Sequence, residues 1–228
     1  MAMTMLRTAL SDLTEQADGV LAVTTFQSLA IQWLAPRLGS FQLAHPRIAV
    51  RLDTEGRILD LNHDGFDVGI RSGSGEWPGL ESVYLFPSTR TPLCTPQLRD
   101  ALGGLARPAD LVTAPLIGLE EEWAEWFTAA GVTATPLKKG GRLIADMQTI
   151  AVASALMGRG VALASPYLFA PEIAQGRLVQ PFAAAGELSA GVWLTYPKDR
   201  RRVPKIAAFR DWLTALIADE ARFGPQLP

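Results

Sequence analysis

The stretch "VTTFQSLAIQWLAPRL", residues 23–38, decides how the first part of the chain folds. It overlaps the apolar run "GVLAVTT", residues 19–25, which has the character of a β-strand. Apolar residues then recur at helical spacing from Phe26 to Leu38, so a helix is expected directly after the strand. The first N–H groups of a helix lack intrahelical partners and, with the helix dipole, favour an anion. Thr24 and Thr25 therefore have two interpretations: they line an anion site, or a hydroxyl caps the helix, which is the commoner role.

The residues that follow this helix predict parallel βαβ units. Alternating apolar residues at 48, 50 and 52 are typical of a strand. We expect "ILDLNHDG", residues 58–65, to form a helix closed by Gly65, and "FDVGI", residues 66–70, to form the next strand. Strands and helices that alternate at this spacing indicate a parallel sheet with crossover helices.

A second α/β series begins near residue 114. Its expected elements are the strand "APLIGL" (114–119), the helix "EEEWAEWFTAAG" (120–131), the strand "GGRLIA" (140–145), the helix "DMQTIAVASALMGRG" (146–160, with Asp146 as its cap) and the strand "VALAS" (161–165). The segments "LVQPF" (178–182) and "AGVWLTYP" (190–197) continue the pattern, and an amphipathic helix ends it. Two consecutive α/β lobes, with the last helix returning to the first lobe, are the simplest interpretation.

Composition and motifs argue against several classes of function. The 228 residues are 48% hydrophobic and 19% charged with a net charge of −2, which is typical of a compact soluble protein and unfavourable for binding a polyanion. The single cysteine, Cys94, excludes an internal disulfide and suits a reducing cytoplasm, and no apolar run is long enough for a membrane span. No nucleophile motif, phosphate loop or set of metal ligands is evident, so we expect no catalytic residues, no metal and no cofactor. An enzyme or another small-molecule-binding protein on the same fold stays the alternative.

Two further motifs have structural interpretations. The loop "RSGSGEWPG", residues 71–79, lacks the lysine and helix start of a phosphate loop, so we expect a tight turn. The basic cluster "PKDRRRVPK", residues 197–205, is expected to be a solvated loop, with a phosphate contact as the lesser alternative.

A second helix start, at Asp146, Met147 and Gln148, resembles the first in its position after a strand. Helix starts of two lobes can face one cleft and hold a small anion there. Arg71 would favour the same negative charge, and apolar side chains nearby would favour a small carboxylate with an apolar portion. Arg71 could instead pair with Asp67 or Glu76 and brace its loop.

The stretches "SLAIQWLAPRLGSFQLAHPRIAVRL", "LDLNHDGFDVGIRSGSGEWPGLES", "LCTPQL" and "DMQTIAVASALMGRGVAL" resemble the effector-binding domain of LysR-type transcription regulators. The branch is the one that contains the glycine-cleavage activator and the β-lactamase regulator. The resemblance implies an α/β fold of the type 2 periplasmic-binding-protein kind, with two Rossmann-like lobes joined by two crossover strands. It places lobe I at residues 19–92 and 196–228, lobe II at 93–195, and the remnant of a linker helix or a tail at 1–18.

The resemblance also implies a ligand site and partners. A small-molecule effector would lie between the lobes, and the matching positions are Thr24, Thr25, Phe26, Gln27, Arg71, Ser72, Asp146, Met147, Gln148 and Trp193. The family pairs such domains antiparallel, which makes Ile31 and Leu34 candidates for a homodimer interface and implies a tetramer for the full-length protein. DNA would be bound only through an N-terminal winged helix-turn-helix that this chain is expected to lack. We expect a cytoplasmic protein without membrane contact.

Overall fold

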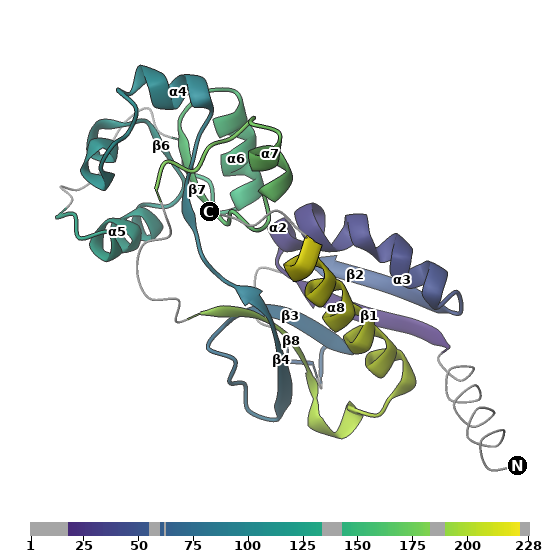
Figure 1. Cartoon of the computed structure of the whole chain (residues 1–228). Coiled ribbons are helices and arrows are strands. Elements are labelled where there is room, and N and C mark those ends of the chain that lie inside the picture. The colour runs from purple at the N-terminus through teal and green to yellow at the C-terminus, as the bar shows by residue number, and fades with distance from the viewer. Residues whose placement is uncertain (1–17, 55–59, 62, 134–142, 183–189, 224–228) are drawn as a thin grey trace, which may run out of the picture. The chain divides into compact units, whose positions relative to one another are not determined.

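The computed structural model describes residues 18–54, 60–61, 63–133, 143–182 and 190–223 (Figure 1). The chain divides into two compact units: unit 1 comprises Met1–Pro87 and Ala190–Gly224, and unit 2 comprises Ser88–Ser189 and Pro225–Pro228. The chain therefore passes between the units after Pro87 and again after Ser189. Both passages lie a few residues earlier than the lobe boundaries expected at 92 and 195, because the strand that begins at Gly191 belongs to the sheet of unit 1.

Unit 1 is built on a mixed five-stranded sheet in the order β2-β1-β3-β8-β4. The strands are β1 (Gly19–Thr25), β2 (Ile48–Thr54), β3 (Val68–Gly73), β4 (Leu80–Pro87) and β8 (Gly191–Pro197). β1 pairs in parallel with both β2 and β3, whereas β8 runs antiparallel to β3 and β4. The expected parallel βαβ unit is thus confirmed.

The helix after β1 is continuous from residue 27 to residue 44 but not uniform. It consists of α2 (Gln27–Leu29), the π-helical turn η1 (Ala30–Leu34), the 3₁₀ turn η2 (Ala35–Arg37) and α3 (Leu38–Ala44), with right-handed helical backbone angles at each junction. We call this segment helix 27–44. π-helical turns are rare and occur often near functional sites.

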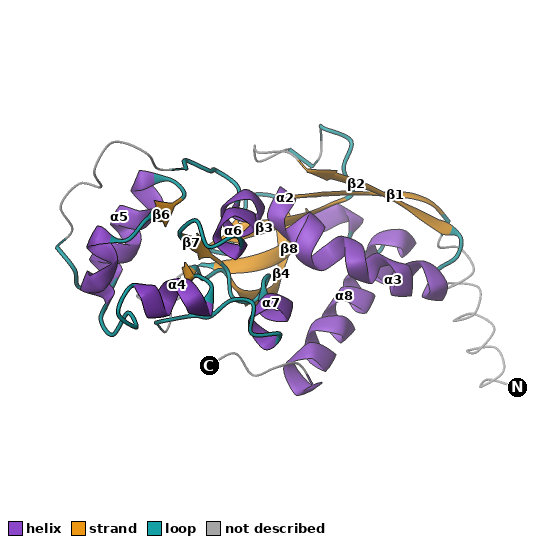
Figure 2. Ribbon diagram, turned by 90° about the horizontal axis from the view of Figure 1, so that it is seen from above, coloured by secondary structure: helices purple, strands orange, loops and turns teal. Residues whose placement is uncertain are grey.

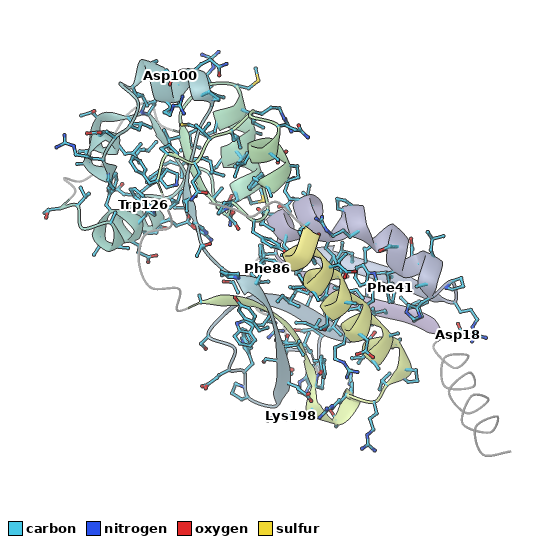
Figure 3. All side chains as sticks on the ribbon, viewed as in Figure 1. Asp18, Phe41, Phe86, Asp100, Trp126 and Lys198 are labelled. Carbon is cyan, nitrogen blue, oxygen red and sulfur yellow. The ribbon has the colours of Figure 1, made fainter. Side chains whose placement is uncertain are left out.

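Helix 27–44 packs against the last helix, α8 (Pro204–Phe223), on one side of the sheet (Figures 1 and 2). The Phe41 ring lies 5.4 Å from Phe209 and 5.3 Å from Trp212 (Figure 3). A carboxylate supplements these apolar contacts: Glu220 accepts a hydrogen bond from Arg37 Nε at 2.6 Å and from Trp33 Nε1 at 3.1 Å. The two helices are therefore joined by both apolar packing and charge.

A second charged contact joins α8 to the beginning of β1. Lys205 Nζ donates to Asp67 Oδ2 at 2.7 Å and to the carbonyl oxygen of Val20 at 2.8 Å. The same carboxylate oxygen accepts the backbone N–H of Ala22 at 2.9 Å. Asp67 immediately precedes β3, so this one carboxylate links β1, β3 and α8.

Unit 2 has a smaller sheet in the order β5-β7-β6, with β5 (Thr91–Leu93), β6 (Leu116–Ile117) and β7 (Val161–Ala164). Its helices are α4 (Pro96–Ala101), η3 (Pro108–Thr113), α5 (Glu120–Ala129), α6 (Gln148–Leu156) and α7 (Ala170–Ala174), and η4 (Lys198–Arg200) belongs to unit 1. Trp123, Trp126 and Phe127 of α5 form the centre of an aromatic core with ring centroids 5.4 to 5.9 Å apart (Figure 3). Three strands this short bury little surface themselves, so the three large aromatic side chains of α5 are an important part of the apolar packing.

Three expected elements differ from the structure. Of the helix expected at 58–65, the described residues form a hydrogen-bonded turn that ends at Gly65, and the rest lie outside the described residues. Of the strand expected at 140–145, residues 140–142 lie outside the described residues and residues 143–145 are not a strand. The carbonyl of Leu143 accepts the N–H of Gly118, and Leu143 and Ile144 are exposed. The segment 178–182 contributes a single bridge between Val179 and Cys94.

Candidate functional site

The start of helix 27–44 in unit 1 lies at the carboxyl end of β1. Thr25 pairs with Ile70 of β3, and its hydroxyl donates to the carbonyl oxygen of Ile70 at 3.1 Å. The residue at the N-cap position is Phe26, which has extended backbone angles and makes no side-chain capping hydrogen bond. The capping interpretation of Thr25 is therefore wrong: its hydroxyl joins two strands and does not close the helix.

The other candidates of unit 1 differ in accessibility. Thr24 is buried, Phe26 is half-buried, and Gln27 and Ser72 are exposed. Thr24, Phe26 and Gln27 surround the same helix start, and Ser72 lies near the end of β3, the strand beside β1. These residues thus lie at one edge of the sheet, the carboxyl edge of its parallel strands, and their contact with a ligand stays a prediction.

Arg71 lies differently from what we expected. A Cβ built on Gly69 would be 3.0 Å from Arg71 Nε, so the guanidinium extends back along β3, away from its carboxyl end. Partial burial lowers the pKa of Arg71 from its ordinary value, and the nearby Asp60 carboxylate acts in the opposite direction. The acidic residue that influences Arg71 is therefore Asp60, while Asp67 bonds to Lys205. This orientation favours a structural role for Arg71, and its contact with a ligand stays a prediction.

In unit 2, α6 begins next to the carboxyl end of β7. Gln148, the first residue of α6, accepts the backbone N–H of Ser165 through Oε1 at 2.8 Å, and Ser165 directly follows β7. The N-cap residue is Met147, with extended backbone angles and no side-chain capping hydrogen bond. The expected cap, Asp146, is exposed and one residue too early to fill that position.

The directions of these two hydrogen bonds determine which donors and acceptors the side chains of Gln148 and Thr25 have left for a ligand. A backbone N–H only donates, so the amide of Gln148 must turn its oxygen toward Ser165, which leaves the two hydrogens of Nε2 pointing elsewhere. A carbonyl oxygen only accepts, so Thr25 donates its one hydroxyl hydrogen to Ile70. The Thr25 hydroxyl oxygen can still accept a hydrogen bond. The helix start in unit 2 therefore adds side-chain donors, and the helix start in unit 1 adds an acceptor.

The structure also reveals a polar residue that sequence reasoning missed. The hydroxyl of Thr91 is fully buried and has no hydrogen-bond partner among the residues that the structure describes. Thr91 pairs with Ala164, the residue before Ser165, so it lies close to the contact of Gln148. Buried hydroxyls normally have partners, and a missing one calls for an explanation such as a ligand or water. Nothing in "TRTPLCTP" singles out this threonine, because the segment is simply extended and apolar.

The remaining candidates are Trp193 and the two interface residues. Trp193 Nε1 donates to the carbonyl oxygen of Gly73 at 3.0 Å. Ile31 is 50% exposed, as a docking residue should be, but Leu34 is 0% exposed. The interface prediction for Leu34 is wrong, because this side chain lies on the inner face of helix 27–44 with Trp33.

Within the described part of the chain, no group of three or more His, Cys, Asp or Glu residues could hold a metal ion. Burial raises the pKa of the Cys94 thiol to about 11, which suppresses the reactive thiolate. None of the described helices is both long and apolar enough to span a bilayer.

Two α/β units, each with a helix that begins at the carboxyl edge of parallel strands, agree with the fold of type 2 periplasmic binding proteins. The family model described as LysR substrate binding domain matches residues 14–218. The chain belongs to this family, the effector domains of LysR-type transcription regulators.

Similar proteins agree with this assignment. The HTH-type transcriptional activator AmpR of Pseudomonas aeruginosa is 38% identical over 207 residues, which cover 89% of this chain and 68% of the relative. AmpR of Citrobacter koseri is 37% identical over 199 residues, covering 86% and 67%. The glycine cleavage system transcriptional activator of Escherichia coli K12 is 34% identical over 206 residues, covering 90% and 67%.

Solved structures show the same fold. The effector domain of AmpR from Pseudomonas aeruginosa matches with a TM-score of 0.74 and 34% identity, covering 92% of this chain and 100% of that one. CrgA, a LysR-type regulator from Neisseria meningitidis, matches with a TM-score of 0.78 at 22% identity over 95% of this chain and 74% of that one. The second likeness concerns the fold alone.

Proposed function

We propose that this chain is the sensing part of a transcription regulator. It binds a small carboxylate-bearing effector between its two units and relays binding to an N-terminal DNA-binding domain of the full-length protein. One observation carries the anionic preference: in each unit a helix begins at the carboxyl edge of parallel strands with no side-chain cap. Backbone N–H groups at such a helix start, together with the helix dipole, favour a negative charge.

The proposed contacts fall into two halves. Unit 2 offers donors from Gln148 Nε2 beside the start of α6, with Met147 as apolar contact and Thr91 as a buried hydroxyl. Unit 1 offers the start of helix 27–44 and the acceptor oxygen of Thr25. Thr24, Phe26, Gln27, Arg71, Ser72, Asp146 and Trp193 complete the proposed set.

A screen of ligands by thermal shift tests this proposal. Amino acids, organic acids and aromatic acids should be compared, each with its neutral amide as a matched control. A ligand that binds only the folded state stabilises it by about 2.7 kcal/mol at one hundred times its dissociation constant. We expect the stabilising compounds to be carboxylates whose amides bind more weakly. Equal binding of acid and amide would contradict the anionic site, and a ligand that protects neither helix start from hydrogen exchange would contradict its location.

The proposal also holds that the chain is not an enzyme and that it acts in the cytoplasm. Its curated relatives are transcription regulators, and neither of the two proposed helix starts carries a nucleophile with an adjacent base. The alternative is a binding protein or enzyme on the same fold. Any compound from the screen should be recovered unchanged after long incubation with the chain, and turnover would favour the alternative.

DNA binding is proposed for the full-length protein through its N-terminal domain. The basic cluster at 197–205 is partly neutralised here: Arg201 approaches Glu81 at 3.6 Å and Lys205 bonds to Asp67 at 2.7 Å. With a net charge of −2, the chain alone should bind DNA weakly, without sequence preference, and with an affinity that falls steeply with salt. Sequence-selective binding by this chain in a gel-shift assay would contradict that view.

The proposed assembly is a homodimer, and a tetramer for the full-length protein. Each unit presents exposed apolar residues at a helix: Ile31 and Leu43 on helix 27–44, Ile150 on α6, and Met157 directly after α6. An antiparallel two-fold pairing would bury both sets in one isologous interface. Sedimentation should show that Ile31→Asp shifts the chain toward monomer, whereas Ala215→Asp, an exposed position of α8, leaves the assembly unchanged. A monomeric wild-type chain at high micromolar concentration would contradict the pairing.

A further inference from the structure

The small sheet of unit 2 has two faces that are covered differently. Leu116, Val161 and Leu163 belong to the aromatic core together with the rings of α5. Successive residues of a strand point to opposite faces, so Ala162 and Ala164 of β7 point to the other face. α6 packs on β7, and none of its described buried residues belongs to the aromatic core (Figure 1). The face of Ala162 and Ala164 is therefore the one that α6 covers.

Thr91 lies on the face toward α6. It pairs directly with Ala164, and residues that pair directly across two strands point to the same face. Ala164 precedes Ser165, whose N–H is bonded to the side chain of Gln148 at the start of α6. Thr91 is 0% exposed, and its hydroxyl has no hydrogen-bond partner among the residues that the structure describes. A fully buried hydroxyl without a partner thus lies beside this helix start.

Three kinds of hydrogen-bond donor meet at this place in unit 2. The Thr91 hydroxyl has one hydrogen, Gln148 Nε2 has two because the amide oxygen is held by Ser165, and the first N–H groups of α6 point out of the helix end. Only a group that accepts several hydrogen bonds uses all of them, and a carboxylate has about four acceptor sites. The helix dipole favours its negative charge. Met147 and Gln148 are half-buried, so a small anion can reach this helix start from solvent.

We propose that the Thr91 hydroxyl donates a hydrogen bond to a carboxylate bound at the start of α6, which makes Thr91 a specificity-determining residue of unit 2. Without the carboxylate the buried hydroxyl costs stability, and binding relieves that cost. A neutral group gains less there, because hydrogen bonds to a charged acceptor are stronger. The inference deepens the proposed effector site and rests on the proposed function for its biological role, but every contact in it belongs to unit 2.

Two buried threonines give a matched pair of variants. Thr91 and Thr195 are both 0% exposed and lie in strands, but the Thr195 hydroxyl donates to the carbonyl oxygen of Gly69 at 3.1 Å. Valine replaces the hydroxyl by a methyl group of similar size. Thr195→Val leaves that carbonyl without its partner and should lower the midpoint of chemical denaturation, whereas Thr91→Val removes an unpartnered group and should keep or raise the midpoint. Thr91→Ser keeps the hydroxyl and is the conservative variant.

Binding is measured with acetate as the probe and acetamide as its neutral control. Both are titrated into the full chain at constant ionic strength, and the NMR shifts of the backbone amides of residues 148–150 are followed. We expect acetate to shift these amides in the wild type, in Thr91→Ser and in Thr195→Val with similar affinity. Thr91→Val should bind acetate about tenfold more weakly, because a hydrogen bond to a charged group is lost. Acetamide should shift the same amides much less in all four chains.

A midpoint that falls as far for Thr91→Val as for Thr195→Val would overturn the proposal, because the Thr91 hydroxyl would then have a partner in the free chain. Equal affinity of the wild type and Thr91→Val for acetate would overturn it too, as would the absence of shifts at residues 148–150 in the wild type. If Thr91→Val fails to fold, Thr91→Ala in the same titration decides between the binding outcomes.

These results and those of the effector screen can fail separately. Acetate is the probe here, so a screen that finds no effector leaves the comparison of Thr91→Val with Thr195→Val intact. A confirmed effector whose affinity is the same for Thr91→Val and the wild type would contradict the role of Thr91 and leave the proposed function standing.

Discussion

The two helix starts have the same topology but opposite hydrogen-bond polarity. In unit 1 the Thr25 side chain donates to the sheet, and in unit 2 the Gln148 side chain accepts from the end of a strand. The parts of the protein on which the two helices pack differ as well. Helix 27–44 rests on a five-stranded sheet and is tied to α8 by Glu220, whereas α6 rests on three short strands whose other face meets an aromatic core.

This difference suggests how an effector would be oriented. An anionic group finds side-chain donors at Gln148 but an acceptor at Thr25, so its carboxylate is expected at unit 2. A neutral hydroxyl group of the effector would suit Thr25. We therefore expect the two helix starts to bind different groups of an effector, and the following variants test this expectation.

The largest expected effect is on the separate stabilities of the units. Phe41→Ala in unit 1 and Trp123→Ala in unit 2 each remove a fully buried ring and should each cost about 3–5 kcal/mol of unfolding free energy. Hydrogen exchange followed through a denaturant series should show the loss mainly in the unit that carries the change. An equal loss of stability in both units would mean that the two units unfold together rather than independently.

The next effect concerns the anion subsite. Gln148→Glu keeps an oxygen to accept the N–H of Ser165 but replaces the donors by a negative charge. An acidic effector should bind at least about tenfold more weakly, a change of 1.4 kcal/mol. Gln175→Glu adds the same charge at an exposed position of unit 2 and should leave the affinity unchanged in titration calorimetry. Equal losses in both variants would point to a general charge effect.

A smaller effect is expected at the acceptor subsite. Thr25→Val leaves the carbonyl of Ile70 without its hydroxyl partner and should cost about 1 kcal/mol of stability in chemical denaturation. Thr25→Ser keeps the hydroxyl and should retain most of that stability. Thr25→Val should lower the affinity for a ligand that donates a hydrogen bond to the Thr25 oxygen, and Thr25→Ser should not. A ligand without such a donor should bind both variants equally well.

The last effect is a dependence of stability on alkaline pH. Burial raises the pKa of Cys94 from 9.0 to about 11, so the unfolded chain loses this proton first as the pH rises. The contribution of Cys94 to stability is therefore fully present below pH 9 and declines between pH 9 and 11. Alkylation of Cys94 should be slow in the folded chain at pH 8 and fast after denaturation. Fast alkylation of the native chain would show that unit 2 opens readily around β5.

Much of unit 1 could be predicted because its pattern is local. The run 19–25, the helical spacing after Phe26 and the alternation after Ile48 each identify an element, and their order implies the parallel sheet. The sequence also located both helix starts. It could not show that Thr25 bonds to Ile70 or that Gln148 bonds to Ser165, since those partners are 45 and 17 residues away and depend on strand register.

The errors have physical causes that lie outside local patterns. Leu143 and Ile144 look like a strand, but none of the strands that the structure describes pairs with them. Leu34 looked like a surface residue because helix 27–44 is apolar on more than one side, and its burial depends on how the π-helical turn rotates the helix. The ring contacts of Trp193 with Gly75 and Gly191 join three separate segments, which spacing alone does not reveal.

The contact of Lys205 with Val20 and Asp67 has a mechanical consequence. A pull on the chain ahead of Gly19 loads the first residues of β1, and the bonds from Ala22 to Asp67 and from Lys205 to Val20 carry that load sideways into β3 and α8. The strain would be shared by three elements before it reached Thr25 at the far end of the strand. Unit 1 would then respond to tension as a stiff block, and motion at its first residue would be passed on as rotation of the block rather than stretching of β1.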